Sequence, residues 1–149
     1  MDVRLAPGAP DACFRRRFEA SFIGGMEPVL AAMGMSPDEF ERRMAETGVV
    51  RTVEVDGGKV GFVWTELRGR TLHVHALLLD EAFRGRGIGS TVLRLFESEA
   101  AAEADELELG VQDANVAAWR LYEKAGFREV RGRPEIGFSV LRKALNSTG

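Results

Sequence analysis

The feature that most constrains the fold is a glycine-rich segment that joins an apolar strand pattern to a helical pattern. Residues 83–90 read FRGRGIGS; they follow the run "HALLL" and precede "STVLRLFESEA". The first N–H groups of a helix have no partner within the helix, and the helix dipole favours an anion there. Glycine lacks the Cβ that would keep a phosphate away from these groups. The segment therefore indicates a pyrophosphate-binding turn, although a tight strand-to-helix turn without a ligand gives the same pattern.

Two familiar phosphate-binding motifs do not match this segment. A nucleotide-triphosphate loop requires Gly-Lys-Ser/Thr after four spacer residues, and no lysine occurs here. A Rossmann fingerprint in register with Gly85 and Gly87 requires a third glycine at position 90, which is Ser90. Both classes of nucleotide-binding loop are therefore excluded.

The patterns on either side of the glycines predict a single mixed α/β domain over residues 1–149. The order is helices, antiparallel strands, then strand–helix–strand–helix–strand, which predicts a mixed sheet with helices on both faces. A capping box at Ser36-Pro37-Asp38-Glu39 starts one helix, and Gly126 ends another, with Phe127 covering its end. We expect helices at 11–33 (broken at Gly24-Gly25), 36–47, 88–100 and 115–125, and strands at 49–55, 60–66, 71–79, 105–111, 126–131 and 136–145.

Composition narrows the class of protein further. A chain of 149 residues with a net charge of -3 argues for one soluble domain and against a nucleic-acid partner. No window offers eighteen uncharged apolar residues, so we expect no membrane span. Cys13 is the single cysteine, which excludes an intramolecular disulfide and fits a reducing, cytoplasmic compartment. We see no signal peptide and predict no metal site.

Two sequence blocks resemble the GNAT superfamily of N-acetyltransferases. Residues 84–89, RGRGIG, fit the family signature Arg/Gln-x-x-Gly-x-Gly/Ala, and residues 115–127, NVAAWRLYEKAGF, are similar to the family segment N-x-x-A-x-x-L-Y-E-K-x-G-F. The resemblance covers residues 71–127. It implies a GNAT fold, in which a mostly antiparallel sheet contains a splayed parallel pair of strands. It also implies an enzyme that transfers an acetyl group from acetyl-CoA to a primary amine in a ternary complex.

The same resemblance implies a role for each residue of the acetyl-CoA site. Leu77 and Leu79 would offer backbone groups to the pantetheine arm, and the N–H of Leu77 would face the thioester oxygen and stabilise an oxyanion. Asn115 matches the family's CoA-contacting asparagine, although it also suits a helix N-cap. Tyr122 matches a tyrosine that protonates the leaving thiolate, although it could simply pack on the sheet. The pyrophosphate would lie against Arg84, Gly85, Arg86, Gly87, Ile88, Gly89 and Ser90.

The general base is predicted from the only two histidines, His73 and His75. At spacing two they share one face of the strand, and by strand alternation Leu77 and Leu79 lie on that same face. The run "H-x-H-A-L" also resembles the strand of arylalkylamine N-acetyltransferases, where paired histidines relay a proton. We expect His75 to be the nearer base and His73 a relay or orienter, with a rate that falls below about pH 6.5. Glu66 and Asp80 are weaker candidates.

The acceptor is not determined by the sequence. By the family resemblance it lies between residues 20–40 and 130–137, and it could be a small-molecule or a peptide amine. A homodimer is open as well. The alternative reading is a domain that binds acyl-CoA as a sensor or interaction module without turnover, because a fold alone never proves catalysis.

Overall fold

The strands form one mixed sheet in the order β1-β2-β3-β4-β5-β7-β6 in the computed structural model, which describes residues 1–145. All neighbouring strands are antiparallel except β4 and β5. The strands are β1 (Val3–Pro7), β2 (Val49–Val55), β3 (Gly58–Arg68), β4 (Thr71–Leu79), β5 (Glu106–Gln112), β6 (Arg128–Arg133) and β7 (Phe138–Ala144). The helices are α1 (Ala12–Ala20), α2 (Glu27–Ala32), α3 (Pro37–Glu46), η1 (Glu81–Phe83), α4 (Ile88–Ala100) and α5 (Val116–Lys124). The predicted fold class, a mostly antiparallel sheet with helices on both faces, is confirmed.

The parallel pair at the centre of the sheet separates after four residues. Only Thr71–Val74 of β4 pair with β5, opposite Glu106–Leu109. Beyond Val74, β4 continues to Leu79 along β3 alone. The carboxyl ends of the two parallel strands therefore diverge, as the GNAT resemblance implies, and backbone groups of β4 become accessible to a ligand at this place.

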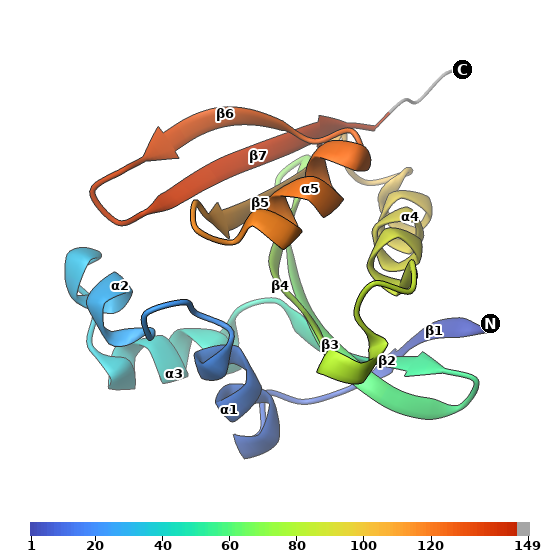
Figure 1. Cartoon of the computed structure of the whole chain (residues 1–149), viewed down its shortest axis with the longest axis horizontal. Coiled ribbons are helices and arrows are strands. Elements are labelled where there is room, and N and C mark those ends of the chain that lie inside the picture. The colour runs from blue at the N-terminus through green and yellow to red at the C-terminus, as the bar shows by residue number, and fades with distance from the viewer. Residues whose placement is uncertain (146–149) are drawn as a thin grey trace.

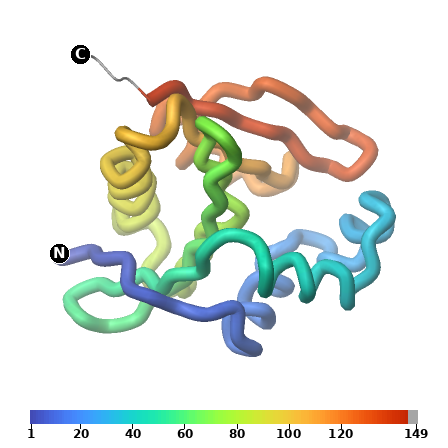
Figure 2. Tube along the Cα trace, turned by 180° about the vertical axis from the view of Figure 1, so that it is seen from behind, coloured from blue at the N-terminus to red at the C-terminus, as the bar shows by residue number. Residues whose placement is uncertain are grey.

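Helices cover the two faces of the sheet unequally (Figures 1 and 2). One core lies under α4 and α5 and includes Val92, Phe96, Leu107 and Leu141, all nearly or fully buried. A second, smaller core lies under α1 and α3 and is rich in aromatic side chains, among them Phe14, Phe18, Phe62 and Trp64. The aromatic core covers only part of its face, so polar side chains of neighbouring strands can stay partly accessible there.

The amphipathic patterns of the two helices that flank the glycine motif are confirmed. Ile88, Val92, Leu93, Phe96 and Ala100 of α4 are buried, because they recur on one side of the helix. The partly buried side of α5 consists of Ala118, Trp119, Leu121, Tyr122 and Ala125. Gly126 ends α5 with a positive φ of 101°, and Phe127 is buried beside it.

The N-terminal third differs from the expected pattern in two places. β1, Val3–Pro7, was not predicted; it pairs with β2 at the edge of the sheet. The break in the first helix is longer than Gly24-Gly25, since α1 ends at Ala20 and α2 begins at Glu27. The predicted start of α3 is confirmed, because Ser36 Oγ accepts a hydrogen bond from the N–H of Glu39 at 3.1 Å. None of the helices within residues 1–145 is long and apolar enough to cross a membrane.

Candidate active site

The loop that leads from β4 into α4 presents a run of free backbone N–H groups. Within residues 1–145, none of the N–H groups of residues 85–90 donates a hydrogen bond to another group of the protein. Residues 88–90 are the first turn of α4, whose N–H groups point out of the helix start. Six free donors in a row, together with the positive end of the helix dipole, favour an anion at this loop.

The glycines of this loop are required by its backbone conformation. Gly85 and Gly87 have φ of 73° and 81°, which L side chains rarely adopt, and no atom lies within 4 Å of a Cβ built at either position. Gly89 differs, because its Cβ would meet Cδ2 of Leu121 at 3.0 Å. The first two glycines therefore keep the loop open on its outer side, and Gly89 lets α4 and α5 approach each other. The loop fits a pyrophosphate.

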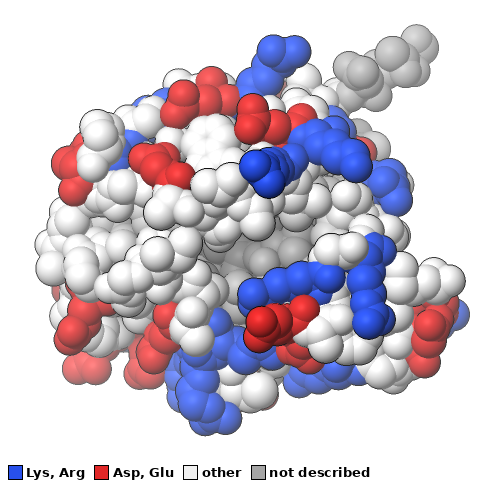
Figure 3. Space-filling model, viewed as in Figure 1, with Lys and Arg blue, Asp and Glu red and all other residues white. Residues whose placement is uncertain are grey.

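Cationic side chains flank the loop. Arg84 Nε donates to the carbonyl oxygen of Leu79 at 3.2 Å, and the guanidinium of Arg86 lies 5.3 Å over the ring of Phe83. Figure 3 shows that the face of Figure 1 is hollowed near its centre, with Lys and Arg side chains along the lower right of the hollow. An anion bound in this hollow would lie beside positive charge.

A β-bulge at His75 decides which side chains of β4 face which core. Trp64 of β3 pairs with Ala76 and Thr65 pairs with Val74, so His75 is an extra residue on β4. His75 stacks on Trp64 of the aromatic core, with ring centroids 4.1 Å apart, whereas Leu77 and Leu79 pack in the core under α4 and α5. The prediction that all four residues share a face is therefore wrong for Leu77 and Leu79, because the bulge interrupts the strand alternation on which it rested.

The two histidines themselves lie together, as predicted. Their ring centroids are 4.5 Å apart, nearly edge to face, and each side chain is 16% exposed. The histidines lie on the face of the sheet opposite Leu77 and Leu79. An acyl donor bound on the α4 side and an acceptor bound on the histidine side would therefore approach the diverging strands from opposite faces.

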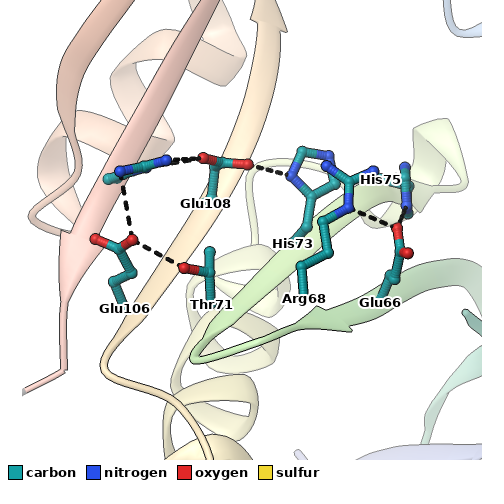
Figure 4. A network of polar contacts seen from close by, with 8 residues as sticks. Glu66, Arg68, Thr71, His73, His75, Glu106 and Glu108 are labelled. Carbon is teal, nitrogen blue, oxygen red and sulfur yellow. Dashed lines mark hydrogen bonds and ion pairs between the residues drawn. The ribbon is translucent and has the colours of Figure 1, made fainter.

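Each histidine contacts a carboxylate on a neighbouring strand (Figure 4). His75 Nε2 lies 2.9 Å from Glu66 Oε1, and the same oxygen accepts a hydrogen bond from Arg68 Nε at 2.8 Å. His73 Nδ1 lies 2.7 Å from Glu108 Oε1. The other oxygen of Glu108 accepts from Arg142 Nε at 2.8 Å.

Burial dominates the ionisation of this cluster. It lowers the pKa of His75 to about 4, against the opposing contact with Glu66, and it lowers the pKa of His73 despite the contact with Glu108. Burial alone would raise the pKa of Glu66 and of Glu108. The hydrogen bonds that each carboxylate receives have the larger combined effect, so the pKa of both lies below the ordinary value. At neutral pH the histidines are therefore neutral and the carboxylates charged. The expected fall in rate accordingly moves from about pH 6.5 toward pH 4.

Tyr122 and Asn115 lie where the second sequence block predicts them, on α5 and at its start. Burial raises the pKa of the Tyr122 phenol to about 12, although part of the side chain stays accessible, and its ring meets Phe127 edge-on at 5.8 Å. Asn115 Oδ1 accepts from the N–H of Ala118 at 3.2 Å, so its expected N-cap role is confirmed. Their roles toward acetyl-CoA stay predictions.

Some residues of the cluster were missed by sequence reasoning. Glu108 of β5 contacts His73, and Arg142 of β7 contacts Glu108, although both strands lie far from β4 in sequence. The alternation of "DELELGV" carries a weak signal, since Glu108 lies between buried Leu107 and Leu109. Asp80, a weaker base candidate, forms an ion pair with Arg17 of α1 and does not join the cluster.

The chain belongs to the acetyltransferase (GNAT) family, whose model matches residues 15–127. It is 35% identical over 77 residues to a mycothiol acetyltransferase of Clavibacter michiganensis. The aligned region covers 51% of this chain and 25% of that relative. It is 30% identical over 104 residues to an uncharacterised N-acetyltransferase of Methanocaldococcus jannaschii. That aligned region covers 64% of this chain and 67% of the relative. The chain thus spans about a quarter of the length of the Clavibacter relative.

Solved structures agree with the fold. An acetyltransferase from Thermus thermophilus superposes with a TM-score of 0.71 at 20% identity, covering 97% of this chain and 98% of that one. The PaiA N-acetyltransferase from Thermoplasma acidophilum, solved in complex with coenzyme A, superposes with a TM-score of 0.69 at 14% identity. The match covers 97% of this chain and 99% of that one. At these identities the likeness establishes the GNAT fold.

Proposed function

We propose that this chain is an N-acetyltransferase that moves an acetyl group from acetyl-CoA to a primary amine by direct attack in a ternary complex. The observation that carries the proposal is the run of six free N–H groups at residues 85–90. Family membership and the histidine pair on the opposite face of the diverging strands support it.

The acyl-donor side uses groups of β4, the glycine loop and α5. Acetyl-CoA, when bound, supplies an activated acetyl group and a thiolate leaving group. The N–H groups of residues 85–90 and the guanidinium of Arg84 would hold its pyrophosphate. Leu77 and Leu79, beyond the last β4–β5 pair, would hold the pantetheine arm through their backbone, and the N–H of Leu77 would stabilise the oxyanion. Asn115 would add a polar contact at the start of α5.

Tyr122 is proposed as the general acid. With a pKa of about 12 its phenol keeps its proton across the working pH range, so a proton is always present for the departing thiolate. The edge-on contact with Phe127 fixes the ring.

His75 is proposed as the general base, with His73 beside it. A free alkyl ammonium has a pKa of about 10.4, so attack requires that the amine lose a proton. A neutral imidazole can take it directly or through water, and the lowered pKa of His75 keeps it neutral well below pH 7. Glu66 could draw the cationic amine toward the site, since its carboxylate is charged.

The acceptor is proposed to be a small-molecule or peptide amine that enters between the α1–α2 segment and the β6–β7 hairpin. Phe22 and Phe138 approach each other across this entrance, with ring centroids 6.0 Å apart. The Clavibacter relative is named as a mycothiol acetyltransferase, so compounds related to mycothiol belong in a screen of acceptors. A homodimer stays a prediction.

The proposal is tested by binding and turnover together. The melting temperature is measured with acetyl-CoA, with NADH and ATP as controls, and CoA release is then measured over a panel of amines. A ligand at a hundred times its dissociation constant should add about 2.7 kcal/mol to the stability of the folded state. Stabilisation by acetyl-CoA without turnover of any amine would favour the sensor alternative, and no stabilisation at millimolar acetyl-CoA would contradict both.

A glycine pair provides the matched variants for this test. Gly87→Ala forces a side chain onto a φ of 81° at the start of α4, and Gly57→Ala does the same at a φ of 86° in the β2–β3 turn. Both positions are open to solvent, so the backbone strain is similar, about 1 kcal/mol. We expect Gly87→Ala to weaken acetyl-CoA binding at least tenfold more than Gly57→Ala. Equal affinities in the two variants would remove the glycine loop from the binding site.

A further inference from the structure

Glu66 and Glu108 contact different nitrogens of the two histidines. Glu66 meets Nε2 of His75, and Glu108 meets Nδ1 of His73. Both carboxylates are charged at neutral pH, because their pKa values are lowered by the hydrogen bonds that they receive. A charged carboxylate only accepts, so the histidine nitrogen that faces it must carry the hydrogen.

We infer that the two carboxylates hold the histidines in opposite tautomers, and that Glu108 is a positioning residue for the proton transfer. His75 carries its hydrogen on Nε2 and leaves Nδ1 bare; His73 carries its hydrogen on Nδ1 and leaves Nε2 bare. A bare nitrogen is what a base needs, so the tautomers fix which atom of each ring can accept a proton. The tautomers follow from the contacts alone, whereas their effect on the rate rests on the proposed function.

The cluster contains charged groups from each packed strand. His75 faces Glu66 and Arg68 of β3 and His73 of β4, and His73 faces Glu108 of β5. Arg142 of β7 contacts Glu108 Oε2 through Nε at 2.8 Å and through a terminal guanidinium nitrogen at 2.7 Å. A second guanidinium nitrogen lies 3.4 Å from Glu106. Arg142 therefore holds one oxygen of Glu108 with two donors.

This geometry makes the two Glu→Gln changes unequal. In Glu108→Gln, the two donors of Arg142 require the amide oxygen on their side, so the amide NH₂ turns to His73 Nδ1. That nitrogen must then accept, and the hydrogen of His73 moves to Nε2. In Glu66→Gln, His75 and Arg68 donate to the same oxygen; the amide oxygen stays there and the tautomer of His75 is kept.

The tautomers are read directly by long-range ¹H–¹⁵N NMR of the protein labelled with ¹⁵N-histidine. Only two histidines are present, so His73→Gln and His75→Gln assign both signals. We expect Nδ1–H at His73 and Nε2–H at His75 in the wild type, Nε2–H at His73 in Glu108→Gln, and no change in Glu66→Gln. Glu106→Gln is the matched control, because Glu106 lies two residues away on β5 and contacts Thr71 and Arg142 rather than a histidine.

The rate test uses the same variants with the most active amine of the screen. Glu108→Gln is expected to lower kcat roughly tenfold to a hundredfold, with little change in the KM for acetyl-CoA. Adding Arg142→Met frees the amide to turn its oxygen to His73, so the double variant should recover the wild-type tautomer and part of the lost rate. If the role of Glu108 were merely structural, the Glu108→Gln/Arg142→Met double variant would have a lower kcat than Glu108→Gln alone.

Two results would overturn the inference. One is a wild-type His73 with its hydrogen on Nε2, or a charged His73, at pH 8; this measurement needs no variant. The other is a flipped His73 in Glu108→Gln with an unchanged kcat. Absence of turnover by the wild type would instead overturn the proposed function, and the NMR comparison would still decide the tautomers.

Discussion

Among single residues, His75 has a strongly perturbed environment, because little of its ring is exposed to water. It is stacked on Trp64 at 4.1 Å, and burial outweighs the neighbouring carboxylate, so its pKa falls to about 4. The surrounding protein thus favours the neutral ring. The ring therefore stays unprotonated at neutral pH, although the lowered pKa also makes it a weaker base, and folding becomes sensitive to acid.

The acid sensitivity has a defined window. An unfolded histidine has a pKa of about 6.5, so between pH 6.5 and 4 the unfolded state binds more protons than the folded state and stability falls as the pH falls. We expect His75 to contribute a loss on the order of 2–3 kcal/mol across this window. Glu66 and Glu108, with lowered pKa values, lose their stabilising contribution only below about pH 4.5. Urea unfolding at pH 7.5, 6.5, 5.5 and 4.5 measures the slope.

The control for this prediction is His75→Gln, which cannot take up a proton. It should flatten the pH dependence between 6.5 and 4.5 while leaving the smaller effect of His73, whose pKa is lowered as well. A wild-type protein whose free energy of unfolding is constant over this range would show that His75 is accessible to solvent protons without penalty.

Single residues of the cluster differ in how far the sequence could predict them. His73 and His75 are found from their spacing on one strand. Glu108 lies 35 residues after His73, which it contacts. Arg142 lies a further 34 residues after Glu108, which it contacts in turn. Their contacts depend on the strand order β4-β5-β7, which no local pattern encodes.

Among the elements, β4 shows where strand alternation fails as a guide. A period of two puts His73, His75, Leu77 and Leu79 on one face, but the bulge at His75 inserts one residue against β3. A bulge leaves no reliable mark in the sequence, because it depends on the partner strand. In this protein it moves the histidines onto the face opposite the two leucines.

The pairing of β3 with β4 depends on a glycine that the sequence analysis did not single out. A Cβ at Gly61 would lie 2.1 Å from the carbonyl oxygen of Leu78, and only a shift of β4 could relieve that contact. We expect Gly61→Ala to destabilise the fold by about 2–4 kcal/mol. It should also weaken acetyl-CoA binding, because Leu79 pairs directly with Gly61. Thermal unfolding and the acetyl-CoA titration measure the two effects.

Gly58→Ala on the same strand is the matched control for this change. Its Cβ would lie 3.6 Å from the carbonyl oxygen of Val55, an ordinary contact. This variant should keep its affinity for acetyl-CoA and lose little stability. A Gly61→Ala protein as stable as Gly58→Ala would mean that β4 can move outward freely at its carboxyl end.

For the whole molecule, the order of elements and the two motif blocks were sufficient to predict the GNAT fold. They were not sufficient for β1, a five-residue edge strand whose place depends on pairing with β2. They also did not show how the two parts of the sheet are held together beyond the four paired residues of β4 and β5. The core under α4 and α5 contains residues of both parts, and long-range contacts of the α1–α2 segment add a second connection.

Gln112 at the end of β5 forms the polar contacts of this second connection. Its Oε1 accepts from the N–H of Ile23 at 2.8 Å and its Nε2 donates to the carbonyl oxygen of Ile23 at 3.0 Å. Beside it, Phe22 of the same loop meets Phe138 of β7. Gly24 and Gly25 follow with φ of 83° and 88° and open space around the place of a Cβ, and the remaining contacts of the loop, such as Phe22 with Phe18, are made to the neighbouring end of α1.

We expect Gln112→Ala to release the α1–α2 loop without disturbing the acyl-donor side. Two lost hydrogen bonds of about 1 kcal/mol each should speed amide exchange of residues 21–26 by about tenfold or more. The KM for the amine should rise severalfold, and the affinity for acetyl-CoA should stay unchanged because the glycine loop lies elsewhere. Asp113→Ala is the matched control: it removes a 2.6 Å bond between Asp113 and Ser139 of β7 and leaves Ile23 held. If both variants exchange residues 21–26 at the wild-type rate, the aromatic contact of Phe22 with Phe138 is sufficient to hold the loop, and Gln112 has no part in acceptor binding.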